Sequence, residues 1–379
     1  MRKIAVFTGA RSEYGLLYPL LTEIQASTEL ELQLIVSAMH LSPDYGYTVQ
    51  TIEQDGFAIA ARIETLLSSD SPVGTLKSLG LGIIGYADAL ERLKPDMLVL
   101  LGDRYEALGM AQAALIMQIP ILHLHGGEIT QGAYDDAIRH AISKMSTYHA
   151  TSCPQHRQRV IQLGEEPARV FHVGAIGLDN IRGKTRNSRP ETLAFLGLDP
   201  AAEFIFLTYH PVTAGDEPPA ESIDALISAL DSQQQYHVVA SYPNADNGGK
   251  VIISALQQWQ ANNSRVKTIA SLGHHYLDVV SHAALVIGNS SSGIIEIPSL
   301  AVPVVNVGIR QQGRECSKHI IHCPPEPVAI RTAIQQAIAT KDRLQTADNP
   351  YDAGQTSQTV ARLLAVLPLT AQKKFFDLN

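Results

Sequence analysis

Short apolar runs alternate along the chain with longer amphipathic stretches. In the first half, the runs expected to be buried strands are Lys3–Thr8, Leu32–Ala38, Met97–Leu101, Ile121–His125 and Val170–Val173. The stretches between them predict helices over Leu16–Gln25, Leu76–Arg92, Tyr105–Met117, Asp135–Ser146 and Pro154–Leu163. Met97–Leu101 holds only apolar residues, which is typical of a parallel strand buried on both faces. The alternation predicts a doubly wound α/β domain.

A polar stretch from Asn180 to Pro190 interrupts the rhythm, which then restarts. The later strands are expected at Phe204–Thr208, His237–Ser241, Val266–Ile269, Leu285–Gly288 and Val304–Val307. The later helices are expected at Glu221–Leu230, Lys250–Gln260, Tyr276–Ser281, Val328–Ala339 and Gln355–Leu367. We therefore predict two doubly wound, Rossmann-like α/β domains, residues 1–178 and 179–362, with a C-terminal tail over 363–379. The sequence leaves open whether that end packs back on the first domain.

Composition narrows the class of protein. The 379 residues exceed the usual size of a single core, which favours two domains. The net charge of −8 argues against a nucleic-acid partner, but a small anionic ligand needs only a few local cations. The apolar run Ile4–Thr8 is too short for a signal peptide, and no run of about 18 apolar residues predicts a membrane span. The three cysteines show no zinc-like spacing, and a cytoplasmic location is expected.

Polar residues follow almost every predicted strand, where ligands bind in open α/β sheets. In the first domain they are Gly9-Ala10-Arg11, Gly102-Asp103-Arg104 and Gly126-Gly127-Glu128. In the second domain they are His210-Pro211, Asn244, Asn289-Ser290-Ser291-Ser292-Gly293 and Arg310. We expect both sets to face one cleft.

Each candidate for ligand binding has an ordinary structural alternative. The turn Asn289–Gly293 opens a predicted helix, whose free N–H groups can hold a diphosphate, although such clusters are most often plain helix caps. Glu296 can accept the hydroxyls of a ribose or complement a helix dipole. Arg11 and Arg310 can bind phosphate oxygens or form surface salt bridges.

The candidates for proton transfer are carboxylates and one histidine. Asp103 and Glu128 end neighbouring strands and can serve as an acid–base pair, or Asp103 can simply pair with Arg104. Asp135 is a further carboxylate or a helix N-cap. His210 suits proton transfer or contact with a leaving phosphate.

His123 and His125 alternate on one predicted strand, which raises the question of a metal site. No third ligand follows at a suitable spacing. We interpret both histidines as lining the cleft and expect no metal.

Six motifs in order carry a resemblance to the UDP-N-acetylglucosamine 2-epimerase family. They are Gly9-Ala10-Arg11, Gly102-Asp103-Arg104, His125-Gly126-Gly127-Glu128, His210-Pro211-Val212-Thr213, Asn289-Ser290-Ser291-Ser292-Gly293 and Gly308-Ile309-Arg310-Gln311-Gln312-Gly313-Arg314. The match spans about residues 1–365. Tyr134-Asp135-Asp136-Ala137-Ile138-Arg139-His140 resembles the hydrolysing branch, which includes bacterial enzymes of sialic acid synthesis. His125 stands where non-hydrolysing relatives carry Glu, so reversible epimerisation of an intact UDP-sugar is not expected.

The resemblance implies a GT-B-like pair of domains with UDP held mainly by the second. It assigns Ser290, Ser291 and Arg310 to the diphosphate, Glu296 to the ribose, and Asn244 to the uridine side or the sugar. Asn289, in the same turn as Ser290, is a further residue expected to bind substrate. It assigns Asp103, Glu128, Asp135 and His210 to catalysis, with Arg11 and Arg104 nearby. A dimer or tetramer is expected.

The chemistry explains this set, because the C2–H bond of the sugar is barely acidic. Departure of UDP must therefore lead, with loss of the C2 proton giving a glycal that water then converts to the free 2-epimer. The sequence leaves open whether Glu128 or Asp103 is the base; Asp135 carries the other proton, and His210 lies beside the leaving phosphate. No metal or redox cofactor is required.

The expected reaction converts UDP-N-acetylglucosamine and water to N-acetylmannosamine and UDP, for sialic acid synthesis. One alternative substrate is UDP-2,4-diacetamido-2,4,6-trideoxyglucose, from the legionaminic acid pathway. Other readings are a GT-B glycosyltransferase, which would need an acceptor, and a two-domain sugar-binding protein. The expected partners are the UDP-sugar, UDP and further copies of the chain, with no membrane partner.

Overall fold

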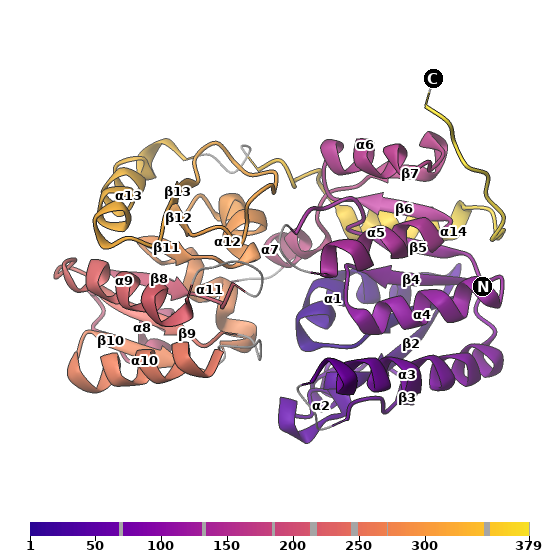
Figure 1. Cartoon of the computed structure of the whole chain (residues 1–379), viewed down its shortest axis with the longest axis horizontal. Helices are drawn as coiled ribbons and strands as arrows, with labels where there is room; N and C mark the ends of the chain where they lie inside the picture. Colours follow the sequence, from indigo (N-terminus) through magenta and orange to yellow (C-terminus); the bar gives the residue numbers. More distant parts are fainter. Residues whose placement is uncertain are drawn as a thin grey trace. The chain divides into compact units, whose positions relative to one another are not determined.

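The computed structural model describes residues 1–67, 71–130, 134–183, 186–212, 218–243, 249–270, 272–344 and 349–378. The chain forms two compact units (Figure 1). Unit 1 comprises Met1–Glu128, Tyr134–Asn180 and Tyr351–Asn379, and unit 2 comprises Ile129–Ala133 and Ile181–Pro350. Each unit is an α/β domain built on its own parallel sheet, as the alternation of apolar runs predicts.

The described strands of unit 1 form a seven-stranded sheet in the order β3-β2-β1-β4-β5-β6-β7. Their bounds are β1 Arg2–Thr8, β2 Leu30–Ser37, β3 Ile59–Ile63, β4 Met97–Leu101, β5 Ile121–Leu124, β6 Tyr148–Thr151 and β7 Val170–His172. The helices are α1 Arg11–Ala26, α2 Val49–Gln54, α3 Pro72–Leu93, α4 Tyr105–Ile116, α5 Asp135–Met145, α6 Pro154–Gln162 and α14 Thr356–Val366, while α7 Asp179–Gly183 joins the units. The strand order reverses between β1 and β4, which is where open α/β sheets bind ligands.

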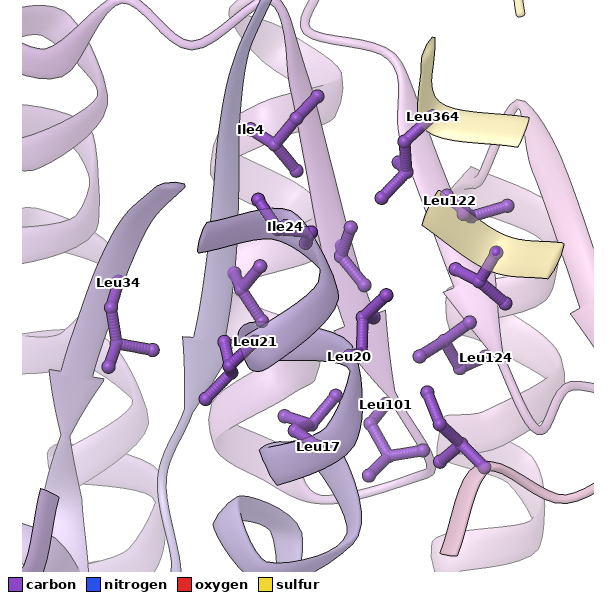
Figure 2. Close-up of a cluster of buried hydrophobic side chains, with 14 of the residues drawn as sticks. Ile4, Leu17, Leu20, Leu21, Ile24, Leu34, Leu101, Leu122, Leu124 and Leu364 are labelled. Atoms are coloured by element: carbon purple, nitrogen blue, oxygen red, sulfur yellow. The ribbon is translucent and has the colours of Figure 1, made fainter. Parts of the chain in front are cut away.

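Both faces of this sheet are covered, which explains the unbroken apolar strands. Ile4 and Val6 of β1 pack with α1 and α14 in one cluster, while Ala5 and Phe7 pack with α3 and α4 in another. Figure 2 shows the first cluster, in which leucines of α1 meet β4, β5 and Leu364 of α14. Because alternate side chains of a strand point to opposite faces, every position must be apolar.

The described strands of unit 2 form a six-stranded parallel sheet in the order β10-β9-β8-β11-β12-β13. Their bounds are β8 Phe204–Thr208, β9 His237–Ser241, β10 Val266–Ile269, β11 Leu285–Gly288, β12 Val304–Val307 and β13 Ile321–Cys323. The helices are α8 Arg189–Leu196, α9 Pro219–Asp231, α10 Gly249–Asn262, α11 Tyr276–Ser281, α12 Ser291–Ile295 and α13 Pro327–Ala339. Here the order reverses between β8 and β11, so His210 and Asn289 follow the two strands at the switch point.

Three described strands, β3, β6 and β13, and three described helices, α2, α7 and α8, were not predicted. The strands β3, β6 and β13 are short, and β6 carries His149, whose ring is buried against Glu165. Helix α8 occupies part of the stretch expected to be a connection. It begins with a capping box in which Glu191 accepts from the backbone N–H of Ser188 at 2.7 Å, a signal present in the sequence as Ser-x-x-Glu.

The C-terminal helix α14 packs within unit 1. Its Val360 and Leu364 join the cluster of β1 and α1, and the Arg2 guanidinium donates to the carbonyl of Leu367 at 2.6 Å. The chain returns to unit 1 at Tyr351, whose carbonyl accepts from the N–H of Ala175 at 2.9 Å. The second domain was predicted to extend further, to residue 362. The apolar face of α14 packs in the same cluster as α1, and the burial of this face places the helix in unit 1. Among the described helices, none combines the length and apolar character needed to span a membrane.

Replacing Leu364 with Ala should weaken unit 1 by about 2–5 kcal/mol, because the cavity left in a close-packed core cannot fully collapse. Val366 lies on the exposed side of the same helix, so Val366→Ala is the matched control and should change stability by less than about 0.5 kcal/mol. Hydrogen exchange of peptides from β1 and α1 measures the effect. Equal protection in the two variants would contradict the packing of α14 in this core.

Candidate active site

A buried arginine links the two predicted acids of unit 1. Asp103 follows β4, Glu128 ends the loop after β5, and Arg139 lies on α5 with only 3% of its side chain exposed. The Arg139 guanidinium forms an ion pair with the Asp103 carboxylate and donates to the Glu128 carbonyl at 3.0 Å. The two acids therefore follow adjacent strands, as the sequence predicts, and the Arg139 side chain binds the loops that carry both of them.

The Glu128 carboxylate is 4% exposed and is bound by His125. His125 Nδ1 lies 2.8 Å from Glu128 Oε1, and the backbone N–H of Ile176 donates to His125 Nε2 at 3.2 Å. Because Nε2 accepts this bond, the proton of a neutral ring lies on Nδ1 and is donated to Glu128. His125 is thus a neutral donor with a defined tautomer.

His123 is fully buried, so the interpretation of this residue as cleft lining is wrong. Its Nε2–H donates to the Gly102 carbonyl at 2.7 Å, and its Nδ1 accepts from Ser143 at 3.0 Å. Burial lowers the pKa of His123 to about 3, and the ring stays neutral. The ring holds the turn directly before Asp103. Among the described residues, no group of three or more His, Cys, Asp or Glu is arranged to hold a metal ion.

Arg104 pairs with Glu106 and not with Asp103. The Arg104 guanidinium meets the two carboxylate oxygens of Glu106 at 2.9 and 3.2 Å. Glu13 lies in the same cluster, where it accepts from Gly9 N–H at 2.7 Å, and burial raises its pKa to about 7. The guanidinium predicted to bind substrate is therefore paired with Glu106 beside the switch point of unit 1, and Glu13 interacts with it electrostatically.

Arg11 and Asp135 begin helices of unit 1. Arg11 is the exposed first residue of α1, directly after the end of β1. Asp135 is the first residue of α5, one turn before Arg139 on the same helix, and is half-buried. The N-cap of α5 is Tyr134, so Asp135 is not the cap that the structural alternative proposed.

In unit 2, Asn289 joins the ends of β8 and β11. Its side chain accepts from His210 N–H at 2.7 Å and donates to the His210 carbonyl at 2.8 Å. Gly288 makes this approach possible, because a Cβ there would lie 1.8 Å from the Thr208 carbonyl oxygen. The Asn289 carbonyl in turn accepts from Arg310 at 3.1 Å and from Gln311 at 2.8 Å. Asn289 thus fixes the turn that presents Ser290 and Arg310.

The helix that follows this turn is short. Ser290 is its N-cap, and α12 extends for five residues from Ser291 to Ile295. Glu296 is its C-cap, with its N–H donating to the Ser292 carbonyl at 2.9 Å, so the reading of Glu296 as a first-turn dipole partner is wrong. Such a short helix carries a small dipole, and Arg310 therefore supplies the positive charge at this turn.

His210 is 7% exposed and neutral at physiological pH. Burial, and then the charge of Arg310, lowers its pKa to about 3. The ring can therefore accept or donate a hydrogen bond but does not bring a charge. Asn244 and Thr213, the remaining predicted positions in this unit, lie outside the described residues.

Two groups of residues were missed as candidates. Arg139 was noted only within a motif, although its position four residues after Asp135 places both on one helical face. Ser152 and His156 follow β6, a strand that was not predicted, so their position at the edge that holds the site was hidden.

The buried neutral His210 predicts a pH dependence of stability for unit 2. Its pKa is about 3 when folded and about 6.5 when unfolded, so the unfolded chain binds more protons below pH 6.5 and stability falls as the pH falls. Between pH 7 and pH 5 this group should remove roughly 2 kcal/mol of unfolding free energy.

Trp259, the single tryptophan of the chain, is buried in unit 2 and reports on its unfolding in urea. His210→Gln should lose about 2 kcal/mol less than the parent protein over this pH range. An identical pH slope in both proteins would show that His210 is not buried as a neutral ring.

Comparisons with known proteins show the family of the chain. A family model described as UDP-N-acetylglucosamine 2-epimerase matches residues 22–365. The chain is 40% identical over 322 residues to the GDP/UDP-N,N'-diacetylbacillosamine 2-epimerase (hydrolyzing) of Campylobacter jejuni, covering 84% of each chain. It is 36% identical over 373 residues to the UDP-N,N'-diacetylbacillosamine 2-epimerase (hydrolyzing) of Legionella pneumophila, covering 98% of each.

Among solved structures, the UDP-GlcNAc 2-epimerase of Neisseria meningitidis bound to UDP-GlcNAc matches with a TM-score of 0.80 and 18% identity, covering 96% of this chain and 99% of that chain. This likeness supports the GT-B-like fold. With a family model that matches most of the chain and hydrolysing relatives at 36–40% identity, the chain belongs to the UDP-N-acetylglucosamine 2-epimerase family, in its hydrolysing branch.

Proposed function

We propose that the protein is a hydrolysing 2-epimerase of a UDP-activated 2-acetamido sugar. It would convert the UDP-sugar and one water to UDP and the free sugar inverted at C2. The observation that carries this proposal is the pair of acids in unit 1, Asp103 and Glu128, joined through the buried guanidinium of Arg139. Two carboxylates in different environments are what an elimination and a following hydration need.

The reaction balances in two steps. In the first, the C1–O bond breaks, UDP leaves with the bonding electrons, and a carboxylate takes the C2 proton, so a C1–C2 double bond forms. In the second, water adds its oxygen at C1 and a proton is delivered to C2 from the opposite face. Neither step requires a metal ion or a redox cofactor.

The environments of the two acids support different roles. Asp103 is paired with a permanent cation, and its carboxylate is held in place to stabilise positive charge at C1. Glu128 is bound by the neutral ring of His125. We therefore propose Glu128 as the base, Asp103 as the stabiliser of the cation, and Asp135 as the group that returns a proton to C2.

The turn after β11 is proposed to bind UDP. Ser290, Ser291 and Arg310 would contact the diphosphate and stabilise its departure, while Asn289 holds the turn in place. His210, neutral and adjacent through Asn289, would donate or accept a hydrogen bond at the leaving phosphate. The remaining assignments are Glu296 for the ribose, Asn244 for the uridine side or the sugar, and Arg11 and Arg104 near the substrate.

Two substrates are candidates within this class. The sequence motifs predict UDP-N-acetylglucosamine, giving N-acetylmannosamine for sialic acid synthesis. The names of the relatives from C. jejuni and L. pneumophila favour the 2,4-diacetamido sugar. We therefore propose UDP-N,N'-diacetylbacillosamine as the preferred substrate, in synthesis of a related nonulosonic acid. A GT-B glycosyltransferase would instead need an acceptor before it released the sugar, and a sugar-binding protein would release no UDP.

Proton NMR of the reaction in heavy water tests the proposal. The expected products are UDP and a free 2-epimeric sugar with deuterium at C2, because the proton is exchanged in the glycal mechanism. The kcat/KM for UDP-N,N'-diacetylbacillosamine should exceed that for UDP-N-acetylglucosamine by about tenfold or more, the usual range for discrimination by a few substituents. Retention of the C2 proton would exclude the elimination, and sugar release only with an acceptor would indicate a glycosyltransferase.

Asp103→Asn, Glu128→Gln and His210→Ala should each lower kcat by about a hundredfold or more, the usual scale for acid–base groups. Asp103→Asn leaves a buried guanidinium without its carboxylate, so loss of folding must be distinguished from loss of chemistry. Hydrogen exchange of α5 makes this distinction. A variant with native protection and near-parental kcat has no catalytic role.

The assembly and location of the protein remain predictions. A dimer or tetramer is expected, and light scattering of the purified protein measures the number of copies. A cytoplasmic location is also proposed.

A further inference from the structure

Two buried residues extend the hydrogen-bond network of Glu128. Ser152 Oγ donates to Glu128 Oε1 at 2.8 Å, and His156 Nδ1 lies 2.9 Å from the same Ser152 oxygen. Ser152 is 0% exposed and His156 is 1% exposed. Neither residue belongs to the motifs that suggested the site.

The directions of these bonds follow from counting protons. A serine hydroxyl has one proton, and a carboxylate can only accept, so the Ser152 proton points to Glu128. Ser152 must then accept from His156, which places a proton on Nδ1 of that ring. With His125 Nδ1–H donating at 2.8 Å, two donors converge on Glu128 Oε1.

The backbone around this network is closely packed. Gly127 has a φ of +80°, and a Cβ there would lie 2.4 Å from the His156 carbonyl oxygen. The loop before Glu128 therefore lies directly against α6, and the guanidinium of Arg159 on α6 donates to the Gly127 carbonyl. The loop and the helix are therefore held against each other around the Glu128 side chain.

We propose that Ser152 and His156 are positioning residues that hold Glu128 charged and oriented toward the sugar. The inference rests on the proposed function, in which Glu128 is the base. Donors to a buried carboxylate favour its charged form. Among the described residues, the charged or titratable groups that contact Glu128 or its loop include His125, directly after β5, Arg159 on α6, and Arg139 on α5, which also pairs with Asp103.

Ser152→Ala tests the serine. It should lower kcat about ten- to hundredfold with little change in KM, the scale expected for one hydrogen bond to a charged group. The acid limb of the kcat profile should move to higher pH by about one unit, because the carboxylate loses a donor that favours its charge. Ser146→Ala is the matched control: Ser146 is equally buried in unit 1, but its hydroxyl donates to the Ile142 carbonyl at 2.7 Å.

His156 provides a second test. Asparagine can present an N–H near the position of Nδ1, whereas glutamine presents it near Nε2, so His156→Asn should retain more activity than His156→Gln. Equal loss in both, or a Ser152→Ala profile that matches Ser146→Ala in kcat and pH, would overturn the inference. If the parent protein itself releases no UDP from either proposed substrate, the proposed function fails, and the two failures are distinguishable.

Discussion

The site in unit 1 depends on the burial of one cation. The guanidinium of Arg139 is buried, with 3% of the side chain exposed. Removing such a charged group from water is unfavourable unless its N–H groups donate to acceptors in the protein. The Asp103 carboxylate and the Glu128 carbonyl bind them. Those acceptors belong to loops after β4 and β5, so the arginine connects α5 to two neighbouring strand ends. Both acids are consequently located by the same interaction.

The sequence predicted the fold where the physical signal was local and strong. Met97–Leu101 reads as a strand because α/β packing buries both of its faces, and the structure has β4 over the same five residues. Strand β6 was missed, since Tyr148-His149-Ala150-Thr151 mixes polar with apolar residues. His149 can be buried because Glu165 lies 3.2 Å away, a contact made by a residue that sequence patterning cannot pair with it. Missing β6 also hid Ser152.

For the candidate site, the sequence predicted which residues follow the strands but not which of them pair. The rule that ligands gather at carboxyl ends of parallel strands identified Asp103, Glu128, His210 and the Ser290 turn. It could not choose partners: Arg104 precedes α4 and pairs with Glu106 two residues later, while Asp103 pairs with Arg139, 36 residues away. Asn289 was expected among the ligands, yet its side chain is used in binding the His210 backbone. Which side chains pair depends on how the loops after neighbouring strands lie in space, and the sequence pattern does not give this.

His125 determines which hydrogen bond the neighbouring Glu128 carboxylate receives. Ile176 N–H donates to Nε2, so the ring must present a proton to Glu128 through Nδ1. A carboxylate at this position would instead place two acids side by side, and such pairs share a proton because both cannot stay charged. By the resemblance, non-hydrolysing relatives carry Glu here. A neutral histidine does not compete with Glu128 for a proton, which agrees with the role of base proposed for Glu128 above.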